Sequence, residues 1–261
     1  MNLTGNTILI TGGTSGIGLE LARQFLVLQN TVIVTGRDQA KLDDARRKFP
    51  ELHAIKSDVS SPKSIALLFD RVTKEFPQLN FLINNAGIMR RINLHLGEGA
   101  LEELTHEIEI NLMGPIQMVK QFLPFLKTRE NAAIMNVTSG LAFVPLPLSP
   151  VYSATKAGLH SYTQSLRVQL KNTSVKVFEL APPGTETPLF HGDFTDKELK
   201  GMKPMPVGAL VKSALAGIKN DTLEIRPGLS NVLKIMSRVA PQFIVNQLGK
   251  SVDDMLDESR N

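Results

Sequence analysis

Residues 7–18 read TILITGGTSGIG, a short apolar run that leads directly into a glycine-rich turn. The run Thr7–Thr11 predicts a buried strand, and the pattern that follows Gly18 predicts a helix. Glycine is also common in ordinary turns. Between a strand and a helix, however, it allows unusual dihedral angles and leaves the N–H groups of the helix start open to an anion. The turn therefore predicts a phosphate-binding site, and the residues expected to form it are Gly12, Thr14, Ser15, Gly16, Ile17 and Gly18.

Short apolar runs alternate with helix-length stretches along the whole chain. Seven runs predict strands at Thr7–Thr11, Thr31–Thr35, Leu52–Lys56, Phe81–Asn84, Ala133–Thr138, Val175–Leu180 and Leu223–Arg226. Helices are predicted between them, among others at Gly18–Leu28, Pro62–Glu75, Leu101–Leu126 and Val151–Leu170. Continuous apolar strands separated by helices are typical of a parallel sheet that is covered on both faces. We predict an α/β fold in which residues 1–261 form a single Rossmann-like, doubly wound domain with a seven-stranded parallel sheet.

Two segments interrupt this alternation, each after a predicted strand. They are Met89–Gly99 and a loop at about 185–206 that is rich in glycine, proline and methionine. Ligands of open α/β sheets bind outside the carboxyl ends of the strands, so we expect these segments to contact a substrate. A C-terminal extension at about 229–261 follows. Its first part, Leu229 to Leu248, has too many polar breaks for a membrane span and predicts an amphipathic helix pair that packs on the domain or on a second subunit.

Composition excludes several classes of protein and binding site. The 29 basic and 25 acidic residues are scattered and give a formal charge of +4, and the chain has no Trp and only two Tyr, so nucleic-acid binding is not expected. The absence of Cys excludes disulfides and thiolate zinc sites, and the five histidines lack metal-ligand spacing, so no metal is expected. The N-terminus lacks the pattern of a signal peptide, and we expect a cytoplasmic protein without membrane contact.

Further motifs follow the glycine-rich turn in a fixed order. Asp58-Val59 follows the third predicted strand, Asn84-Asn85-Ala86-Gly87 follows the fourth, and Tyr152 precedes Lys156 by four residues. Together with Asn111, Ser139 and the Pro183-Gly184 loop that reaches Thr187, this set resembles the classical short-chain dehydrogenase/reductases. The resemblance extends from about Gly5 to Arg226. It implies a nicotinamide cofactor contacted by the turn, by Asp58, Val59, Asn85, Ala86, Gly87, Tyr152 and Lys156, and by Pro183, Gly184 and Thr187.

The residue types suit the transfer of a proton to a carbonyl oxygen. A free tyrosine has a pKa of about 10, so a nearby cation must stabilise the phenolate if Tyr152 is to act near neutral pH. Lys156 lies one helical turn away and can supply that charge. Ser139, which follows the fifth strand, can donate a hydrogen bond to the same oxygen. The resemblance adds that Lys156 binds the nicotinamide ribose and that Asn111 holds a water in a proton relay. Taken singly, Ser139 could instead be a cap, Lys156 a solvated charge and Asn111 a local hydrogen-bonding residue.

The end of the second strand bears on the choice between NADP and NAD. NAD enzymes usually place a carboxylate there for the ribose hydroxyls. This chain has Gly36 and then Arg37, which leave room and positive charge for a 2′-phosphate. Asp38 could still reach a hydroxyl. We therefore favour NADP(H) and keep NAD(H) as an alternative.

The expected function is an NADP-dependent oxidoreductase that transfers a hydride between nicotinamide and a carbonyl or secondary alcohol. A nucleotide-binding regulator of the same fold would be expected to lose Tyr152 or Lys156, and a sugar-nucleotide epimerase does not fit the glycine spacing. The loop from Ala181 and the stretch after Arg226 resemble bacterial oxidoreductases named for the D-alanylation operon. We expect a homodimer or homotetramer built on the apolar helices, a small-molecule substrate, and solvated charges at Arg90 and Arg91.

Overall fold

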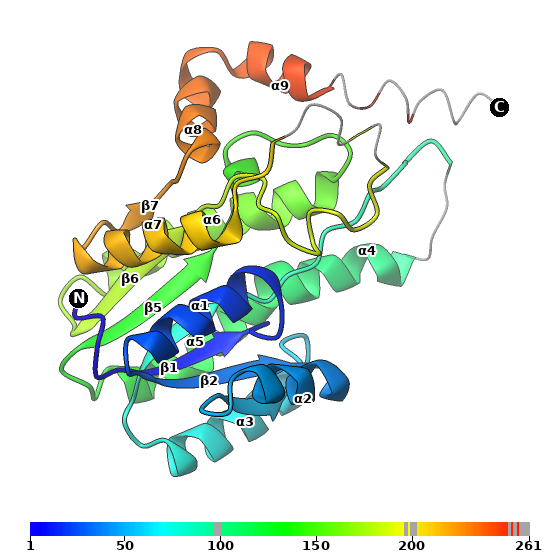
Figure 1. The fold of residues 1–261 in the computed structure, drawn as a ribbon. Helices are drawn as coiled ribbons and strands as arrows, with labels where there is room; N and C mark the ends of the chain where they lie inside the picture. Colours follow the sequence, from blue (N-terminus) through cyan, green and yellow to red (C-terminus); the bar gives the residue numbers. More distant parts are fainter. Residues whose placement is uncertain (97–100, 196–197, 199–202, 250–251, 253–254, 256–261) are drawn as a thin grey trace.

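The computed structural model describes residues 1–96, 101–195, 198, 203–249, 252 and 255. Seven strands form one parallel sheet in the order β3-β2-β1-β4-β5-β6-β7 (Figure 1). The strands are β1 (Thr7–Thr11), β2 (Thr31–Gly36), β3 (His53–Lys56), β4 (Leu79–Asn84), β5 (Ala132–Val137), β6 (Val175–Leu180) and β7 (Glu224–Ile225). The predicted doubly wound, seven-stranded sheet is confirmed, and the strand ends differ from the predicted ones by at most two residues.

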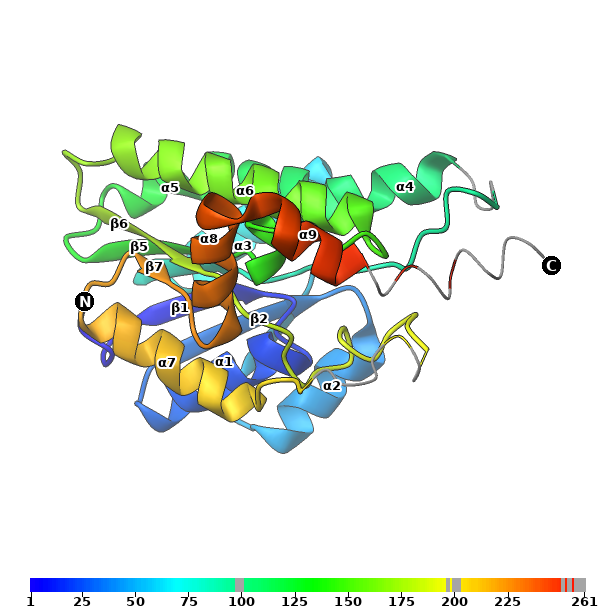
Figure 2. The ribbon, with the colours of Figure 1, turned by 90° about the horizontal axis from the view of Figure 1, so that it is seen from above.

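Helices cover both faces of the sheet (Figure 2). One layer consists of α1 (Gly16–Val27), α2 (Gln39–Lys48) and α7 (Val207–Lys219). The other layer consists of α3 (Pro62–Glu75), α4 (Leu101–Ile108), α5 (Gly114–Leu126) and α6 (Pro150–Gln169). Successive strand residues point to opposite faces, so β1 serves both cores: Ile8 and Ile10 pack in the α1 layer with Phe25, whereas Leu9 packs in the other layer with Phe122.

The strand order places a crevice beside β1. From β1 the chain proceeds to β2 and β3 on one side, and then crosses over to β4 on the other side. The connections after β1 and β4 therefore leave the sheet in opposite directions, which opens a crevice at the carboxyl ends of these strands. The glycine-rich turn follows β1 and the Asn84–Gly87 motif follows β4, so the fold brings both motifs to this crevice.

The predicted continuous helix Leu101–Leu126 is wrong at its centre. α4 ends at Ile108, a π-helical segment spans Glu109–Met113, and α5 starts at Gly114. The N–H of Gly114 is bonded to the carbonyl of Glu109, five residues earlier. Pro115 lacks the N–H that would bond the carbonyl of Asn111 in an α-helix, so regular helical bonding cannot continue through this point.

The C-terminal extension begins with the expected helix pair, α8 (Leu229–Val239) and α9 (Pro241–Gly249). Within the part of the chain that the structure describes, no helix is long and apolar enough to cross a bilayer. Parts of the two predicted substrate segments, residues 97–99 and most of 196–202, lie outside the described residues, as does most of the extension after Gly249.

Candidate active site

A cavity of about 1180 Å³ opens at the carboxyl ends of the strands. All but two of the predicted site residues line it; Gly18 and Asn111 lie behind its wall. The lining residues that the sequence predicted are Gly12, Thr14, Ser15, Gly16, Ile17, Arg37, Asp58, Val59, Asn85, Ala86, Gly87, Ser139, Tyr152, Lys156, Pro183, Gly184 and Thr187. Segments that are far apart in sequence therefore meet around one space.

The Asn84–Gly87 motif holds the glycine-rich turn in place. The backbone N–H groups of Asn85 and Ala86 donate to Thr11 Oγ1 at 3.0 and 3.1 Å, and Asn85 Nδ2 donates to the carbonyls of Thr11 and Gly12, both at 3.0 Å. Gly12 has a φ of +63°, and a Cβ there would lie 2.7 Å from the Cα of Ala86. The side chain of Asn85 is thus occupied by the turn, and only glycine allows this close approach.

The start of α1 is suited to an anion. Its N-cap residue, Ser15, makes no side-chain capping bond, and its first turn has no acidic residue. The first N–H groups of a helix have no partner within the helix and carry a partial positive charge. Gly18 serves packing, because a Cβ there would lie 2.4 Å from the carbonyl oxygen of Gly12. The turn and the helix start therefore fit the pyrophosphate of a dinucleotide.

At the end of β2, the charged side chains have different partners. Asp38 is the N-cap of α2 and accepts a hydrogen bond from the backbone N–H of Lys41 at 3.3 Å. Arg37 Nη1 lies 3.1 Å from Nε2 of His106, and His106 Nδ1 lies 3.3 Å from a carboxylate oxygen of Glu109. Guanidinium has only donors, so Nε2 of His106 accepts and Nδ1 donates. Lys41 lines the cavity beside Arg37 and adds a second cation that sequence reasoning missed.

Asp58 is held in its loop at the end of β3. Its Oδ1 accepts hydrogen bonds from the backbone N–H and the hydroxyl of Ser60, at 2.9 and 2.7 Å. Its own backbone N–H donates to Oγ of Ser64 at 2.9 Å. Asp58 and Val59 both line the cavity next to the end of β2, as an adenine contact requires.

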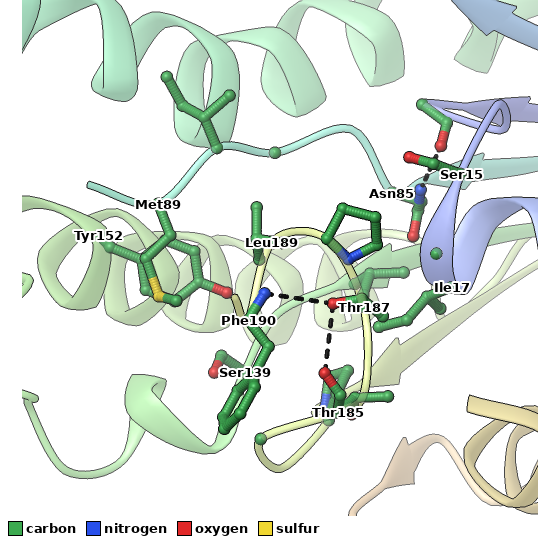
Figure 3. A pocket seen from close by; sticks show the side chains of 18 of the residues that line it. Ser15, Ile17, Asn85, Met89, Ser139, Tyr152, Thr185, Thr187, Leu189 and Phe190 are labelled. Atoms are coloured by element: carbon green, nitrogen blue, oxygen red, sulfur yellow. Dashed lines mark hydrogen bonds between the residues drawn. The ribbon is translucent and has the colours of Figure 1, made fainter. Parts of the chain in front are cut away.

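Tyr152, Lys156 and Ser139 meet at the other end of the cavity. Tyr152 and Lys156 lie on the buried side of α6, and Lys156 Nζ is 5.5 Å from the centre of the Tyr152 ring. Nζ donates to the carbonyl of Val137 at 2.9 Å. Ser139 lies two residues after the end of β5, and its Oγ accepts the N–H of Leu141 at 3.1 Å. Figure 3 shows the labelled side chains of Ser139 and Tyr152 in the pocket.

Burial has the largest influence on the pKa values of Tyr152 and Lys156. Burial raises the pKa of Tyr152 to about 12, although a hydrogen bond from Ser139 opposes this, and the charge of Glu107 raises it further. Burial lowers the pKa of Lys156 to about 8, and the charge of Glu107 opposes that shift. The expected lowering of the Tyr152 pKa by Lys156 is therefore not seen. The ammonium lies over the ring and donates to Val137, so desolvation is the larger effect.

Asn111 fixes the segment after Gly87. Its Oδ1 accepts the N–H of Ile88 at 2.9 Å, and its Nδ2 donates to the carbonyl of Ile88 at 2.8 Å and contacts Thr155 Oγ1 at 3.3 Å. A Cβ on Gly87 would lie 3.2 Å from Asn111 Oδ1 and 3.6 Å from Lys156 Nζ. The side chain of Asn111 thus holds the chain beside Lys156, which is the local hydrogen bonding considered as the alternative to a water relay.

The loop after β6 closes over the glycine-rich turn. Thr187 Oγ1 donates to the carbonyl of Thr185 at 3.2 Å and accepts the N–H of Phe190 at 3.4 Å (Figure 3). A Cβ on Gly16 would lie 3.2 Å from Cγ2 of Thr187, so the loop and the turn are in close contact. The carbonyl of Gly184 accepts the N–H of Met205, which ties the two ends of the loop together at 2.8 Å.

The rest of the cavity wall is mainly apolar. Leucines of the segment before α6, aromatic residues of the loop after β6 and leucines of the C-terminal helices line it: Leu146, Leu148, Phe190, Phe194, Leu229, Leu233 and Leu248. His191, in contrast, is exposed and does not line the cavity. The expectation of solvated charges is wrong for Arg91, whose Nε lies 2.6 Å from a carboxylate oxygen of the buried Glu198. This ion pair joins the two predicted substrate segments.

The described residues contain no group of three or more His, Cys, Asp or Glu that could hold a metal ion.

Comparisons with known proteins agree with this geometry. Residues 6–198 match the family model for short chain dehydrogenase. The chain is 43% identical over 225 residues to the uncharacterized oxidoreductase DltE of Bacillus subtilis, covering 86% of this chain and 89% of that protein. A short-chain dehydrogenase from Sphingobium yanoikuyae, solved with NADPH, matches with a TM-score of 0.78 and 26% identity over 86% of this chain and 88% of that one. A short chain dehydrogenase/reductase from Burkholderia phymatum, solved with NAD, has the same fold with a TM-score of 0.77, 21% identity, and coverage of 90% and 93%. Both resemblances expected from the sequence are confirmed.

Proposed function

Because this chain belongs to the short-chain dehydrogenase/reductase family and is an NAD(P)-dependent oxidoreductase of that family, we propose that it uses NADP(H) to interconvert a carbonyl and a secondary alcohol on an apolar substrate. One observation supports this proposal most strongly. Tyr152, Lys156 and Ser139 lie together at one end of the cavity, and the glycine-rich turn lies at its other end.

The chain's own residues supply the proton chemistry. NADPH, when bound, supplies the hydride. Ser139 Oγ donates a hydrogen bond to the substrate oxygen and Tyr152 gives that oxygen its proton, which opposes the negative charge that develops there. Lys156, with a pKa of about 8, is mostly protonated at neutral pH and stabilises the phenolate that remains. Asn111 holds the Ile88 backbone beside this group.

The preference for NADP(H) is supported by the end of β2. Arg37 and Lys41 both line the cavity there, and Asp38 is engaged as the N-cap of α2. A carboxylate at position 36, which would suit NAD, is disfavoured because a Cβ there would lie 3.0 Å from Cγ2 of Thr14. Two cations beside a carboxylate that caps α2 favour a ribose that carries a 2′-phosphate.

The apolar wall supports an apolar substrate skeleton. Leu146, Leu148 and Phe194 extend the cavity beyond Tyr152, and Leu233 of α8 closes it from the C-terminal side. Burial of a few such contacts is worth several kcal/mol and selects for apolar groups next to the carbonyl.

The remaining proposals concern the whole chain. We propose that residues 1–261 act as one domain in the cytoplasm, and that two or four copies associate through the α4–α6 layer, where Ile108 and Met113 are exposed apolar side chains. Neither nucleic acid nor a membrane is a proposed partner. A regulator without turnover is the alternative, and the presence of both Tyr152 and Lys156 argues against it.

The test is a screen of apolar aldehydes and ketones with NADPH and with NADH, followed by absorbance of the reduced nicotinamide. A substrate found in this way should be turned over about 10²–10⁴ times more slowly by Tyr152→Phe, because that range is typical of lost acid catalysis. The affinity for NADPH should change little. A Tyr152→Phe variant with near-normal kcat would contradict the assignment, and NADPH binding without turnover of any carbonyl would favour the regulator.

A further inference from the structure

A buried carboxylate lies behind Ser139. Glu179, in β6, is fully buried on the side of the sheet that α6 covers. The hydroxyl of Thr138 donates to its Oε1 at 2.7 Å, and Nδ1 of His160 lies 2.8 and 2.9 Å from its two oxygens. An ionised carboxylate only accepts, so Nδ1 of His160 carries the proton of this contact. Loss of either donor would leave a buried charge poorly compensated.

His160 is linked to both ends of the turn that carries Ser139, to Phe143 directly and to Thr138 through Glu179. Through Glu179 it holds Thr138, the residue before Ser139. Its ring also packs edge-on against Phe143, with ring centres 5.1 Å apart and an interplanar angle of 87°. The backbone N–H of Thr138 is bonded to the carbonyl of Leu180 at 2.8 Å, and its side chain is held by the Glu179–His160 pair, while the last residue of the turn, Phe143, packs on the His160 ring. The helix of His160, α6, also carries Tyr152 and Lys156, two turns and one turn earlier.

Within the turn, the residues next to Ser139 are held by two hydrogen bonds. The N–H of Gly140 donates to the carbonyl of Pro182 at 2.7 Å, and the N–H of Leu141 donates to Ser139 Oγ at 3.1 Å. A Cβ on Gly140 would lie 2.8 Å from Ser230 Oγ of α8, so the turn has no space to shift on that side. The backbone on both sides of Ser139 is thus held by Leu180 and Pro182, and the side chains at the two ends of the turn are held by Glu179 and His160.

Charged residues of the C-terminal part complete the cluster. Glu224 of β7 is the register partner of Glu179, and it forms ion pairs with Lys234 and with Arg226. Lys234 lies over the Phe143 ring, 5.0 Å from its centre. Lys234 and Arg226 thus balance the second carboxylate, and Lys234 also covers the aromatic ring that His160 contacts.

From these contacts we infer that His160 and Glu179 are positioning residues for Ser139. They set where the Ser139 hydroxyl stands relative to Tyr152, which lies on the same helix as His160. This inference rests on the proposed function only for its effect on turnover; the effect on the turn itself can be measured without a substrate. A misplacement of about 1 Å in a catalytic arrangement can lower the rate about a hundredfold. We therefore expect a loss in kcat rather than in cofactor binding.

The test uses variants of the full chain that separate the two contacts of His160. His160→Phe keeps a ring against Phe143 and removes the donor to Glu179, whereas His160→Asn keeps an N–H close to the position of Nδ1. Thr138→Val removes the hydroxyl at the other side of Glu179. Thr163→Val is the matched control: Thr163 is fully buried on α6, accepts from Asn136 Nδ2 of β5 at 2.9 Å and donates to the carbonyl of Leu159, and both of these partners lie outside the turn.

Two measurements are made on each variant. Hydrogen exchange by mass spectrometry follows the amides of residues 138–143, and NADPH oxidation with 4-nitrobenzaldehyde, or with a better carbonyl from the screen, gives kcat and KM. We expect His160→Phe and Thr138→Val to speed exchange in the turn at least tenfold and to lower kcat about 10- to 100-fold, with an unchanged Kd for NADPH. His160→Asn should recover most of the loss.

Thr163→Val should lower the melting temperature without changing exchange in the turn or kcat. The inference is overturned if His160→Phe and Thr138→Val affect the turn and kcat no more than Thr163→Val does. If His160→Phe does not fold, Thr138→Val and His160→Asn decide by the same criteria. If none of the carbonyls tested supports NADPH oxidation by the wild type, the proposed function fails. Hydrogen exchange in the turn still decides the inference in that case.

Discussion

Replacing Glu107 with Gln should change how the free energy of unfolding depends on pH. Glu107 lies in α4, is fully buried, and neither of its carboxylate oxygens has a hydrogen-bond partner among the described residues. Burial raises its pKa from 4.5 to about 7, against the opposing influence of the Arg90 backbone and of the charges of Arg90 and Lys156.

The sign and size follow from proton linkage. Between pH 4.5 and 7 the folded state binds a proton at Glu107 that the unfolded state has largely lost, so the free energy of unfolding falls as the pH rises. The shift to about 7 corresponds to about 3 kcal/mol in total, of which about 2 kcal/mol is lost between about pH 5 and pH 7. Gln carries no charge, so the stability of Glu107→Gln relative to wild type should rise by about 2 kcal/mol over this range.

Urea unfolding followed by far-ultraviolet circular dichroism, at several pH values between about 5 and 8, measures this difference. The chain has no Trp, so circular dichroism is preferable to fluorescence. Glu102→Gln is the control, because Glu102 is an exposed residue of the same helix and its replacement should leave the pH dependence parallel to that of wild type. A difference between Glu107→Gln and wild type that stays constant across this range would refute a buried carboxyl with a raised pKa.

Three further results are expected. Arg37→Ala should weaken NADPH binding about 10- to 100-fold and NADH binding much less, because a charge-assisted hydrogen bond to the 2′-phosphate contributes roughly 1.5–3 kcal/mol; calorimetric titration that finds equal weakening would identify another selector. The rate of carbonyl reduction should fall as the pH rises through about 8, where Lys156 loses its proton, and a pH–rate profile that is flat well above this value would contradict the role of that cation. Sedimentation at micromolar concentration should give a dimer or tetramer, and a monomer alone would count against the proposed association through the α4–α6 layer.

Most strands were readable from the sequence because helices cover both faces of the sheet. Thr7–Thr11 and Val175–Leu180 were predicted with their observed bounds, since the first is an apolar run between two threonines and the second has apolar residues at four of its six positions. The break after Ile108 was not readable in the same way. The apolar pattern continues from α4 into α5, and the signal that was available, Pro115 four residues after Asn111, was not used.

The residues of the candidate site likewise differ in how well the sequence predicts them. Tyr152, Lys156 and Ser139 could be predicted because a motif fixes their order in the chain. His160 and Glu179 have no such motif, and their contact depends on how α6 lies across β6. A weaker signal existed: in the strand Val175–Leu180, Glu179 is a charged residue that alternation places on the same face as Val177. A carboxylate at such a position requires a buried donor, but the sequence does not say which residue provides it.

The segment from α4 to the π-helix links the two ends of the cavity. His106 accepts from Arg37 at the adenosine end, and the next residue, Glu107, acts through its charge on Tyr152 and Lys156. Asn111, four residues on, fixes Ile88 beside Lys156. In a regular helix, residues 107 and 111 would lie on one face, and the π-helical segment that starts at Glu109 widens that face around Asn111. A substitution that restores a regular helix here, such as Pro115→Ala, is therefore expected to displace the side chain of Asn111 directly. It should affect Arg37 only indirectly, through the contact of Arg37 with His106.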